Sequence, residues 1–408
     1  MPTVSPDRAR AARLAVSAMF LVNGAIQSSI LPRLPAIKDG LGLSNAELGA
    51  AVAAMPVGGL LAGGLVGILI GRFGSGRLAT ITGTLAALTL VGVGLAGSWA
   101  TLAVAMLVLG MFDATMDASM NAHGIGVQRV YRRSILQGFH GMWSLGSMGA
   151  GAVGLAMAAA GVPVAVHLSV AAVLLAVTAA TAGHWFLPDQ VADAHPAHEP
   201  EPLPIRPSAL PHLLRVLVPI AMLGILCVLL QSSAATWSAV YLADVLDQPA
   251  GIAALGYVLY MGAMVAGRMT NDRWVDRWGT VAVVRTGALI GAIAVALVML
   301  AGPADAAPVA LLGFALVGFG SSPMFPVLVA AAGSRPGIPA RHGIAIAGWL
   351  VRGGLVLAPT AIGAAADAFG LGAALGISLV ASLAMATATG WLTGTPRRRP
   401  APGVVPAS

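Results

Sequence analysis

Two aspartates stand one helical turn apart in a part of the sequence that is otherwise apolar. They are Asp113 and Asp117 in the stretch DATMDASMN, and no charged residue occurs from Thr101 to Phe112 just before them. With Asn121 they are spaced i, i+4 and i+8, so in a helix all three side chains share one stripe. An ionised aspartate at the centre of a bilayer costs about 2.5–3.5 kcal/mol on insertion scales, so a functional role is the first hypothesis.

The chemistry that this spacing suggests is proton transfer. Two neighbouring carboxylates in a low-dielectric medium do not both ionise easily, so one can take a proton from one side and release it to the other. The sequence therefore predicts Asp117 and Asp113 as proton-coupling residues. His140, one turn into the following apolar run, is a candidate proton relay or solute contact. A structural pair of aspartates, held by partners on neighbouring helices, is the alternative.

Further polar side chains lie within apolar runs and are candidates for solute contact. Arg352 reads as the only basic residue deep within such a run, and it could bind an anionic group of a solute or pair with an aspartate of the stripe. The other side chains that we expect to contact solute are Asn23, Gln27, Asn121, Gln231, Trp237 and Trp349. Amides also join neighbouring membrane helices, which is their alternative role, and Trp143 is expected to pack.

The composition predicts a membrane protein. Of the 408 residues 58% are hydrophobic and 9% are charged, whereas a soluble domain is typically about a quarter charged. So few charges cannot cover the apolar surface of a soluble fold, so lipid is the solvent for most of the chain. Cys227 is the only cysteine, which excludes an intramolecular disulfide and a multi-cysteine metal site. No cofactor or metal is expected.

Twelve apolar runs are long enough to cross a bilayer, six on each side of a polar, Pro-rich segment. We therefore predict an N-terminal six-helix bundle at 1–187, a flexible cytoplasmic linker at 188–212, a C-terminal bundle at 213–396 and a tail at 397–408. The runs lie at 14–32, 46–70, 78–97, 100–128, 137–160, 163–187, 213–243, 251–270, 281–301, 307–332, 342–366 and 370–393. Pro323 and Pro326 predict a kink in the tenth run.

The basic residues indicate the orientation. Lysine and arginine mark the cytoplasmic side of a membrane protein, and here they gather before the first run, in alternate connections and in the tail. Arg268, for example, is read as part of the cluster around the connection between runs eight and nine. Both termini are therefore expected in the cytoplasm, with the chain in the cell membrane. The net charge of +7 is a topology signal, and nucleic-acid binding is not expected.

The two halves of the sequence repeat each other. IQSS at 26–29 returns as LQSS at 230–233, GRFG at 71–74 as DRWG at 276–279, LGMF at 109–112 as VGFG at 317–320, and MWSLG at 142–146 as GWLVR at 348–352. The offsets stay between 204 and 208, and each pair falls on equivalent runs. Six is an even number, so the halves keep one orientation, as in large twelve-span carriers.

These features resemble the major facilitator superfamily over nearly the whole chain. Its loop signature, Gly-x-x-x-Asp-Arg-x-Gly, is matched by Asp276, Arg277 and Gly279 in the second half, whereas Gly71 replaces the acid in the first. The resemblance implies an all-α fold of two six-helix bundles, with runs 1, 4, 7 and 10 lining a central cavity. It also implies that two loops latch a cytoplasmic gate, through Arg72, Gly74, Arg77, Asp272, Asp276, Arg277 and Gly279.

Within this superfamily, runs four and five resemble the fucose–proton symporter branch. The residues that carry this likeness are Asp117-x-x-x-Asn121 and Gln137-Gly-Phe139-His140. The branch also has an acid near the end of its first span, where this sequence has Ser28. That difference argues against fucose as the solute.

Other classes of protein fit less well. An intramembrane aspartyl protease needs its two aspartates on different helices, and motifs of zinc proteases, α/β-hydrolases and phosphate-binding loops are missing, so the chain is not expected to be an enzyme. A channel would show a filter segment. The sequence predicts a monomeric secondary transporter of a small polar solute, sugar-like or anionic, coupled to protons. A proton-driven exporter of drugs or metabolites and a non-transporting, receptor-like relative are the alternatives.

Overall fold

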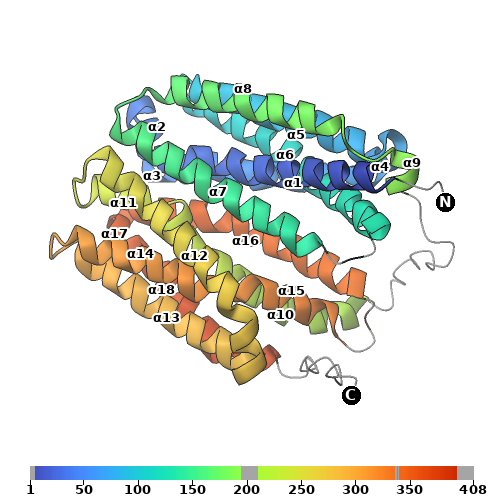
Figure 1. Cartoon of the computed structure of the whole chain (residues 1–408). Coiled ribbons are helices and arrows are strands. Elements are labelled where there is room, and N and C mark those ends of the chain that lie inside the picture. Colours follow the sequence, from blue (N-terminus) through green and yellow to red (C-terminus); the bar gives the residue numbers. More distant parts are fainter. Residues whose placement is uncertain are drawn as a thin grey trace, which may run out of the picture.

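The computed structural model describes residues 5–131, 133, 135–193, 210–335, 338 and 340–392, and within these ranges every regular element is a helix. Figure 1 shows the helices running roughly side by side. In the first half they are α1 (Pro6–Ile30), η1 (Leu31–Arg33), α2 (Leu34–Leu41), α3 (Asn45–Gly63), α4 (Val66–Phe73), α5 (Ser75–Gly94), α6 (Trp99–Tyr131), α7 (Leu136–Ala159), α8 (Val164–Gly183) and α9 (Asp189–Ala192). In the second they are α10 (Leu210–Ala235), α11 (Ser238–Asp244), α12 (Ala250–Trp278), α13 (Thr280–Ala301), α14 (Ala307–Ser321), α15 (Met324–Gly333), α16 (Ala340–Phe369), α17 (Leu371–Ala374), α18 (Gly376–Ala388) and η3 (Thr389–Leu392).

Twelve helical segments in the described part of the chain are long and apolar enough to cross a membrane, which confirms the predicted count. A chain in lipid must satisfy its backbone hydrogen bonds internally, so each apolar run folds as a helix. The tenth span is interrupted as predicted: α14 ends at Ser321 and α15 begins at Met324, with Pro323 between them.

Helices α1–α8 pack mainly against one another, as do α10–α18, and we call these groups the first and second bundles. The first residue of α1 and the last residue of η3 lie at the same end of the molecule, which we call the terminal end (Figure 1). Helices α2, α11 and α17 lie at the opposite end, which we call the far end.

The glycines of the repeated loops have one shared backbone conformation. Gly74, between α4 and α5, has φ 84° and ψ 152°, and Gly279, between α12 and α13, has φ 81° and ψ 160°. A residue with a Cβ rarely adopts this conformation, so glycine is required at both turns. The repeat seen in the letters GRFG and DRWG is therefore a repeat of backbone geometry.

A second pair of repeated glycines brings helices into close contact. A Cβ on Gly110 of α6 would lie 1.8 Å from the Met55 carbonyl oxygen of α3, and one on Gly318 of α14 would lie 2.0 Å from that of Tyr260 in α12. Neither position tolerates a Cβ without movement of the backbone. Glycine at these positions lets two helices approach closely where lipid gives no hydrophobic drive between them.

Replacing Gly110 with alanine should therefore destabilise the first bundle, by about 1–3 kcal/mol as is usual for overpacking. Thermal unfolding of the purified protein in detergent measures the effect as a lower melting temperature. Gly149→Ala is the matched control, because nothing lies within 4 Å of a Cβ at Gly149. Equal melting temperatures for the two variants would contradict this account of the α3–α6 contact.

The two bundles are joined at the far end. Asp367, near the end of α16, accepts hydrogen bonds from the backbone N–H groups of Asn45 (2.9 Å) and Ala46 (3.0 Å), the first residues of α3. These N–H groups have no partner within their own helix, so the carboxylate caps α3 across the bundle interface. Lys38 of α2 forms an ion pair with Asp244 at the end of α11.

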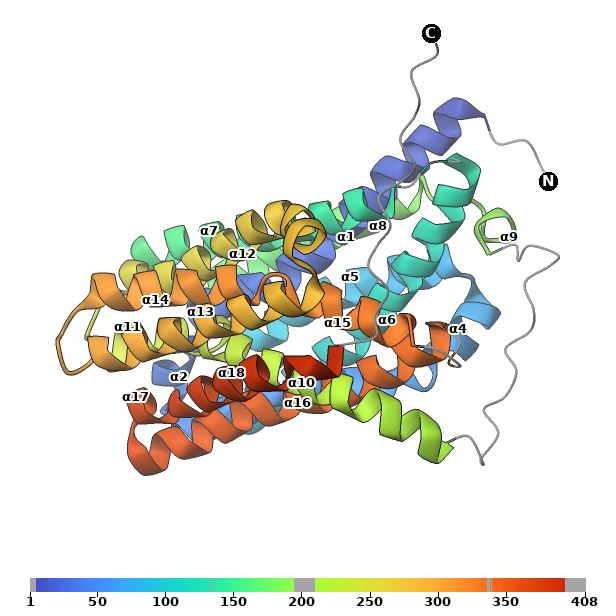
Figure 2. The same cartoon turned by 90° about the horizontal axis from the view of Figure 1, so that it is seen from below.

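A buried hydroxyl chain also joins the bundles. Tyr257 of α12 donates to Ser28 Oγ of α1 (2.7 Å), and Ser28 Oγ lies 2.7 Å from Ser147 Oγ of α7. Helices α7 and α12 lie side by side in both views (Figure 2). Ser28, the residue that stands where the fucose symporters have an acid, is thus part of the contact between bundles.

Candidate functional site

The predicted stripe on α6 faces α1 and the second bundle. Asp113 accepts a hydrogen bond from Asn23 Nδ2 of α1 at 2.8 Å. One turn on, Asn121 Nδ2 donates to the Asp117 carboxylate (3.1 Å) and to the Asp117 carbonyl oxygen (2.8 Å). Both aspartates are half-buried. The two carboxyl groups therefore have different surroundings: Asp113 is tied to a neighbouring helix, and Asp117 only to its own.

Asn23 joins three helices through one side chain. Its Nδ2 donates to Asp113 on α6, while its Oδ1 accepts from Trp143 Nε1 on α7 at 3.0 Å. The side chain is buried, so these bonds are shielded from water. Trp143 packs against the core of the first bundle as expected, and its indole N–H in addition finds an acceptor across the bundle.

Arg352 extends from α16 of the second bundle to the first. Its Nη1 lies 3.5 Å from the Gly59 carbonyl oxygen of α3, and its charge is close enough to act on both Asp113 and Asp117. It forms no ion pair with a carboxylate of the described residues. The cation thus faces the acidic stripe across the bundle interface without neutralising it by direct contact.

His140 lies near the stripe on the terminal side. Its ring packs edge-on against Phe20 of α1 with centroids 5.2 Å apart, and the side chain is exposed. Asp117 is close enough to act on it electrostatically. The structure therefore brings together the three predicted proton-coupling residues: Asp113 and Asp117 lie on α6, and His140 lies on α7 close to Asp117.

The charged side chains lie at one depth in the molecule. Asp117 and Arg268 each lie 18 residues after the first residue of their helices, Trp99 and Ala250, which start at the far end. Arg352 lies 17 residues before Phe369, the last residue of α16. At about 1.5 Å per residue, the distances of these positions from the far ends of their own helices differ by only about 2 Å. We call Asp117, His140, Arg268 and Arg352 the charged layer.

Arg268 lies near the end of the eighth span, within the run that the sequence predicts at 251–270. It was read as part of a cytoplasmic cluster, and Arg352 as the only basic residue deep in a span. In the structure α12 continues to Trp278, and Arg268 lies inside the membrane-spanning segment Ala250–Asn271. The second bundle therefore places two arginines in the charged layer.

The remaining side chains that the sequence predicts to contact solute differ in how exposed they are. Gln27 is exposed and Gln231 half-buried, and neither makes a hydrogen bond to the described part of the chain. Trp349, three residues before Arg352, is 65% exposed. Trp237 is 0% exposed and packs near Gly49 of α3, so in this conformation it contacts protein only, contrary to the prediction.

The predicted gating residues make no ion pairs within the described residues. The guanidinium of Arg72 lies over the neighbouring Phe73 ring, and Arg77, Asp276 and Arg277 are exposed. The side chain of Asp272 lies outside the described residues. Their role in a gate stays a prediction.

The start of the predicted linker is ordered against the first bundle. Asp189 accepts from the Gly76 N–H (2.7 Å) and Asp193 from the Ser75 N–H (2.9 Å), so these acids cap α5 beside the loop in which Gly71 replaces the signature acid. Burial raises the pKa of Asp189, although the hydrogen bond from Gly76 opposes the shift. The prediction of a wholly extended linker was therefore wrong at 189–192; residues 194–209 and the predicted tail at 397–408 lie outside the described residues.

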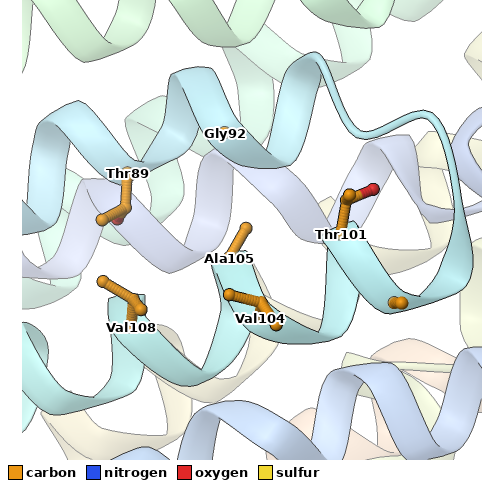
Figure 3. A pocket seen from close by; sticks show the side chains of 7 residues that line it. Thr89, Gly92, Thr101, Val104, Ala105 and Val108 are labelled. Carbon is orange, nitrogen blue, oxygen red and sulfur yellow. The ribbon is translucent and has the colours of Figure 1, made fainter.

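A hollow between α5 and α6 is separate from this site. It has a volume of about 460 Å³ and is lined by Thr89, Gly92, Ala100, Thr101, Val104, Ala105 and Val108 (Figure 3). None of these residues is charged, and Val104 is 62% exposed, as expected for a surface that faces lipid.

The fold and the site define a class of protein: a multi-pass helical membrane protein whose two bundles face each other across polar and charged side chains. Residues 16–343 match the Major Facilitator Superfamily, and the chain belongs to this family. It is 29% identical over 361 residues to an uncharacterized MFS-type transporter of Yersinia pestis, covering 88% of this chain and 89% of the relative. It is 27% identical over 370 residues to the membrane protein MosC of Rhizobium meliloti, covering 88% and 85% of the two chains.

Solved structures have the same fold. The nucleoside transporter NupG matches with a TM-score of 0.78 and 13% identity, covering 94% of this chain and 99% of NupG. A D-xylose–proton symporter matches with a TM-score of 0.69 and 14% identity, covering 95% and 98%. The protein is therefore a transporter of small-molecule solutes rather than an enzyme. A place in the fucose symporter branch stays a prediction.

Proposed function

We propose that this chain is a proton-coupled secondary transporter that moves a small polar solute by alternating access between its two bundles. The observation that carries the proposal is the acidic stripe of α6, which faces Arg352 across the bundle interface. Side chains in this position are partly exposed although they lie between the bundles, so protein does not fill the interface at this level. A polar solute fits such a site because amides, carboxyls and arginines surround it.

The basic connections support a cytoplasmic location for the terminal end, in the cell membrane. Most hydrogen bonds that join the bundles, counted between described residues, lie at or toward the far end. The bond from Arg352 to Gly59 also joins the bundles, and it is the one nearest to the terminal end. The exposed His140 lies on the terminal side of the acidic stripe. The conformation is accordingly the inward-facing one, in which the solute site opens toward the cytoplasm.

Proton coupling follows from the different surroundings of the two aspartates. Asp113 is fixed by Asn23 and stays in place through the cycle, whereas Asp117 has a partner on its own helix and the exposed His140 nearby. Asp117 exchanges a proton with the cytoplasm in this conformation. Protonation changes the attraction between Asp117 and Arg352, which links proton binding to the approach of the bundles.

The far-end contacts should hold the inward-facing state. In the double variant Lys38→Ala, Asp367→Ala we expect the ratio of inward- to outward-facing molecules to fall about 5–30-fold, because a lost cap and an exposed ion pair together remove about 1–2 kcal/mol. The change is measured with spin labels at Asp39 and Phe369, which are exposed at the far end of opposite bundles, in a Cys227→Ser background. A shift toward the outward-facing state appears as a longer distance between the two labels.

Asp7→Ala is the control for this measurement, because it removes an exposed ion pair with Arg10 at the terminal end. Unchanged label distances in the double variant would mean that the far-end contacts do not set the conformational equilibrium.

The proposed function is tested by reconstitution. Purified protein in vesicles is exposed to pools of sugars, organic acids, amino acids and cationic drugs while the internal pH and the current are recorded. Acidification of the vesicle interior by one pool, absent in protein-free vesicles, is the expected result. Solute uptake without any movement of protons would disprove coupling, and a response to the drug pool alone would identify an exporter.

A further inference from the structure

Arg268 is a second intramembrane cation that neither the stripe nor the far-end contacts use. Its Nε is buried without a hydrogen-bond partner, and no ion pair joins it to a carboxylate among the described residues. Residue Arg268 as a whole is half-buried. A lone arginine in a membrane span is costly, so a cation kept without a partner requires a role.

The described neighbours of Arg268 include no carboxylate of its own bundle. Tyr260 of the same helix and Cys227 of α10 are the groups of its own bundle on which it acts, and both are buried and neutral. From the first bundle it faces His140 on α7. Among the side chains that the structure describes, no carboxylate of the second bundle pairs with Arg268, and the carboxylates of the first bundle act on Arg352.

The charged layer is therefore divided between the bundles. The first bundle supplies Asp117 and His140, and the second supplies Arg268 and Arg352 at the same depth. A guanidinium group binds the paired oxygens of a carboxylate or a phosphate in a bidentate manner. An uncharged solute would leave Arg268 without a counter-charge.

We propose that Arg268 and Arg352 bind the anionic group of the transported solute, so that the substrate is a small organic anion. This inference rests on the proposed transport function and names its substrate class. The solute's oxygens take the place of water at the two guanidinium groups, and Gln231, one turn from Cys227 on α10, is placed to bind an uncharged part of the solute.

The test uses the purified full chain and matched probes: gluconate as the carboxylate, glucose 6-phosphate and glycerol 3-phosphate as phosphate esters, lactate and succinate as smaller acids, and glucose and glycerol as uncharged counterparts. Thermal stabilisation measures binding, and currents in vesicles measure transport. At least one anion should stabilise the protein when its uncharged counterpart does not. Arg268→Gln should raise the half-saturating concentration about 10–100-fold, as expected for a lost charge-assisted hydrogen bond.

Three further variants make the test specific. Arg268→Lys keeps the charge and should retain part of the affinity, which separates loss of binding from loss of folding. Arg273→Gln removes an exposed arginine of the same helix and should change nothing. Asp272→Asn is combined with Arg268→Gln, because Asp272 follows one turn later in α12. Rescue of binding by this second change would identify a structural charge pair and overturn the proposal.

The outcomes separate the inference from the function on which it rests. Stabilisation by uncharged probes alone, by no anion, or equally in Arg268→Gln would overturn the anion site. If an uncharged probe then drives a proton-linked current, the proposed transport function stands although the proposed anion site does not. If an anion binds through Arg268 but moves no protons, the anion site stands and proton coupling is disproved.

Discussion

Replacing Asp117 with asparagine is expected to reduce proton-driven accumulation of the solute to the level of protein-free vesicles, while exchange of solute across the membrane continues. Asparagine has nearly the shape of aspartate and can still bond to Asn121, but it cannot take up or release a proton. Net transport with protons needs that step, whereas exchange needs only binding and the movement of the loaded carrier. The measurement compares accumulation under a pH gradient with counterflow of labelled solute at equal pH.

Two further variants interpret this result. Asp39→Asn is the control, because Asp39 is exposed on α2 and its side chain makes no hydrogen bond to the described residues. Asp113→Asn distinguishes the two carboxyls: if it abolishes accumulation and Asp117→Asn does not, the proton is carried one turn nearer the far end. Accumulation that survives both changes would make the stripe structural.

The second large effect is expected at Asn23. In Asn23→Leu the Asp113 carboxylate loses its donor and the Trp143 indole its acceptor, at a cost of about 1–3 kcal/mol for each buried group left unpaired. We expect a clearly lower melting temperature, together with transport reduced by at least about tenfold because Asp113 is no longer held in place. Thermal unfolding and uptake are measured on the same preparation.

Trp143→Phe is the graded comparison. It removes only the bond to Asn23 Oδ1 and keeps the contact between Asn23 and Asp113, so it should lose less stability and retain most transport. If Asn23→Leu proves as stable and active as the unchanged protein, the amide does not organise the site.

The spans could be predicted because lipid leaves the chain few choices. A long apolar run must form a helix in a bilayer, and two prolines close together in the tenth run favour a break, so the twelve segments and the break at Pro323 could be predicted from the sequence. The repeated glycines were equally visible, since Gly74 and Gly279 share a conformation that side chains disfavour.

The site was only partly predictable, because its contacts join helices distant in sequence. The spacing of Asp113 and Asp117 indicated the stripe, but the bond from Trp143 to Asn23 depends on how α1 and α7 cross. The length of α12 could not be predicted, because three polar or charged residues, Asn271 to Arg273, follow Arg268 closely and resemble the start of a loop. Hydropathy cannot show that α12 continues past them to Trp278.

The most direct test of the account is the reversal of solute flux in vesicles at a fixed solute gradient, with the membrane potential clamped and the pH gradient varied. Coupled transport predicts a pH gradient at which net flux stops and then changes direction, and a steeper solute gradient should move that point in proportion. Flux that follows the solute gradient alone, whatever the pH gradient, would contradict the claim that the acidic stripe couples solute movement to protons.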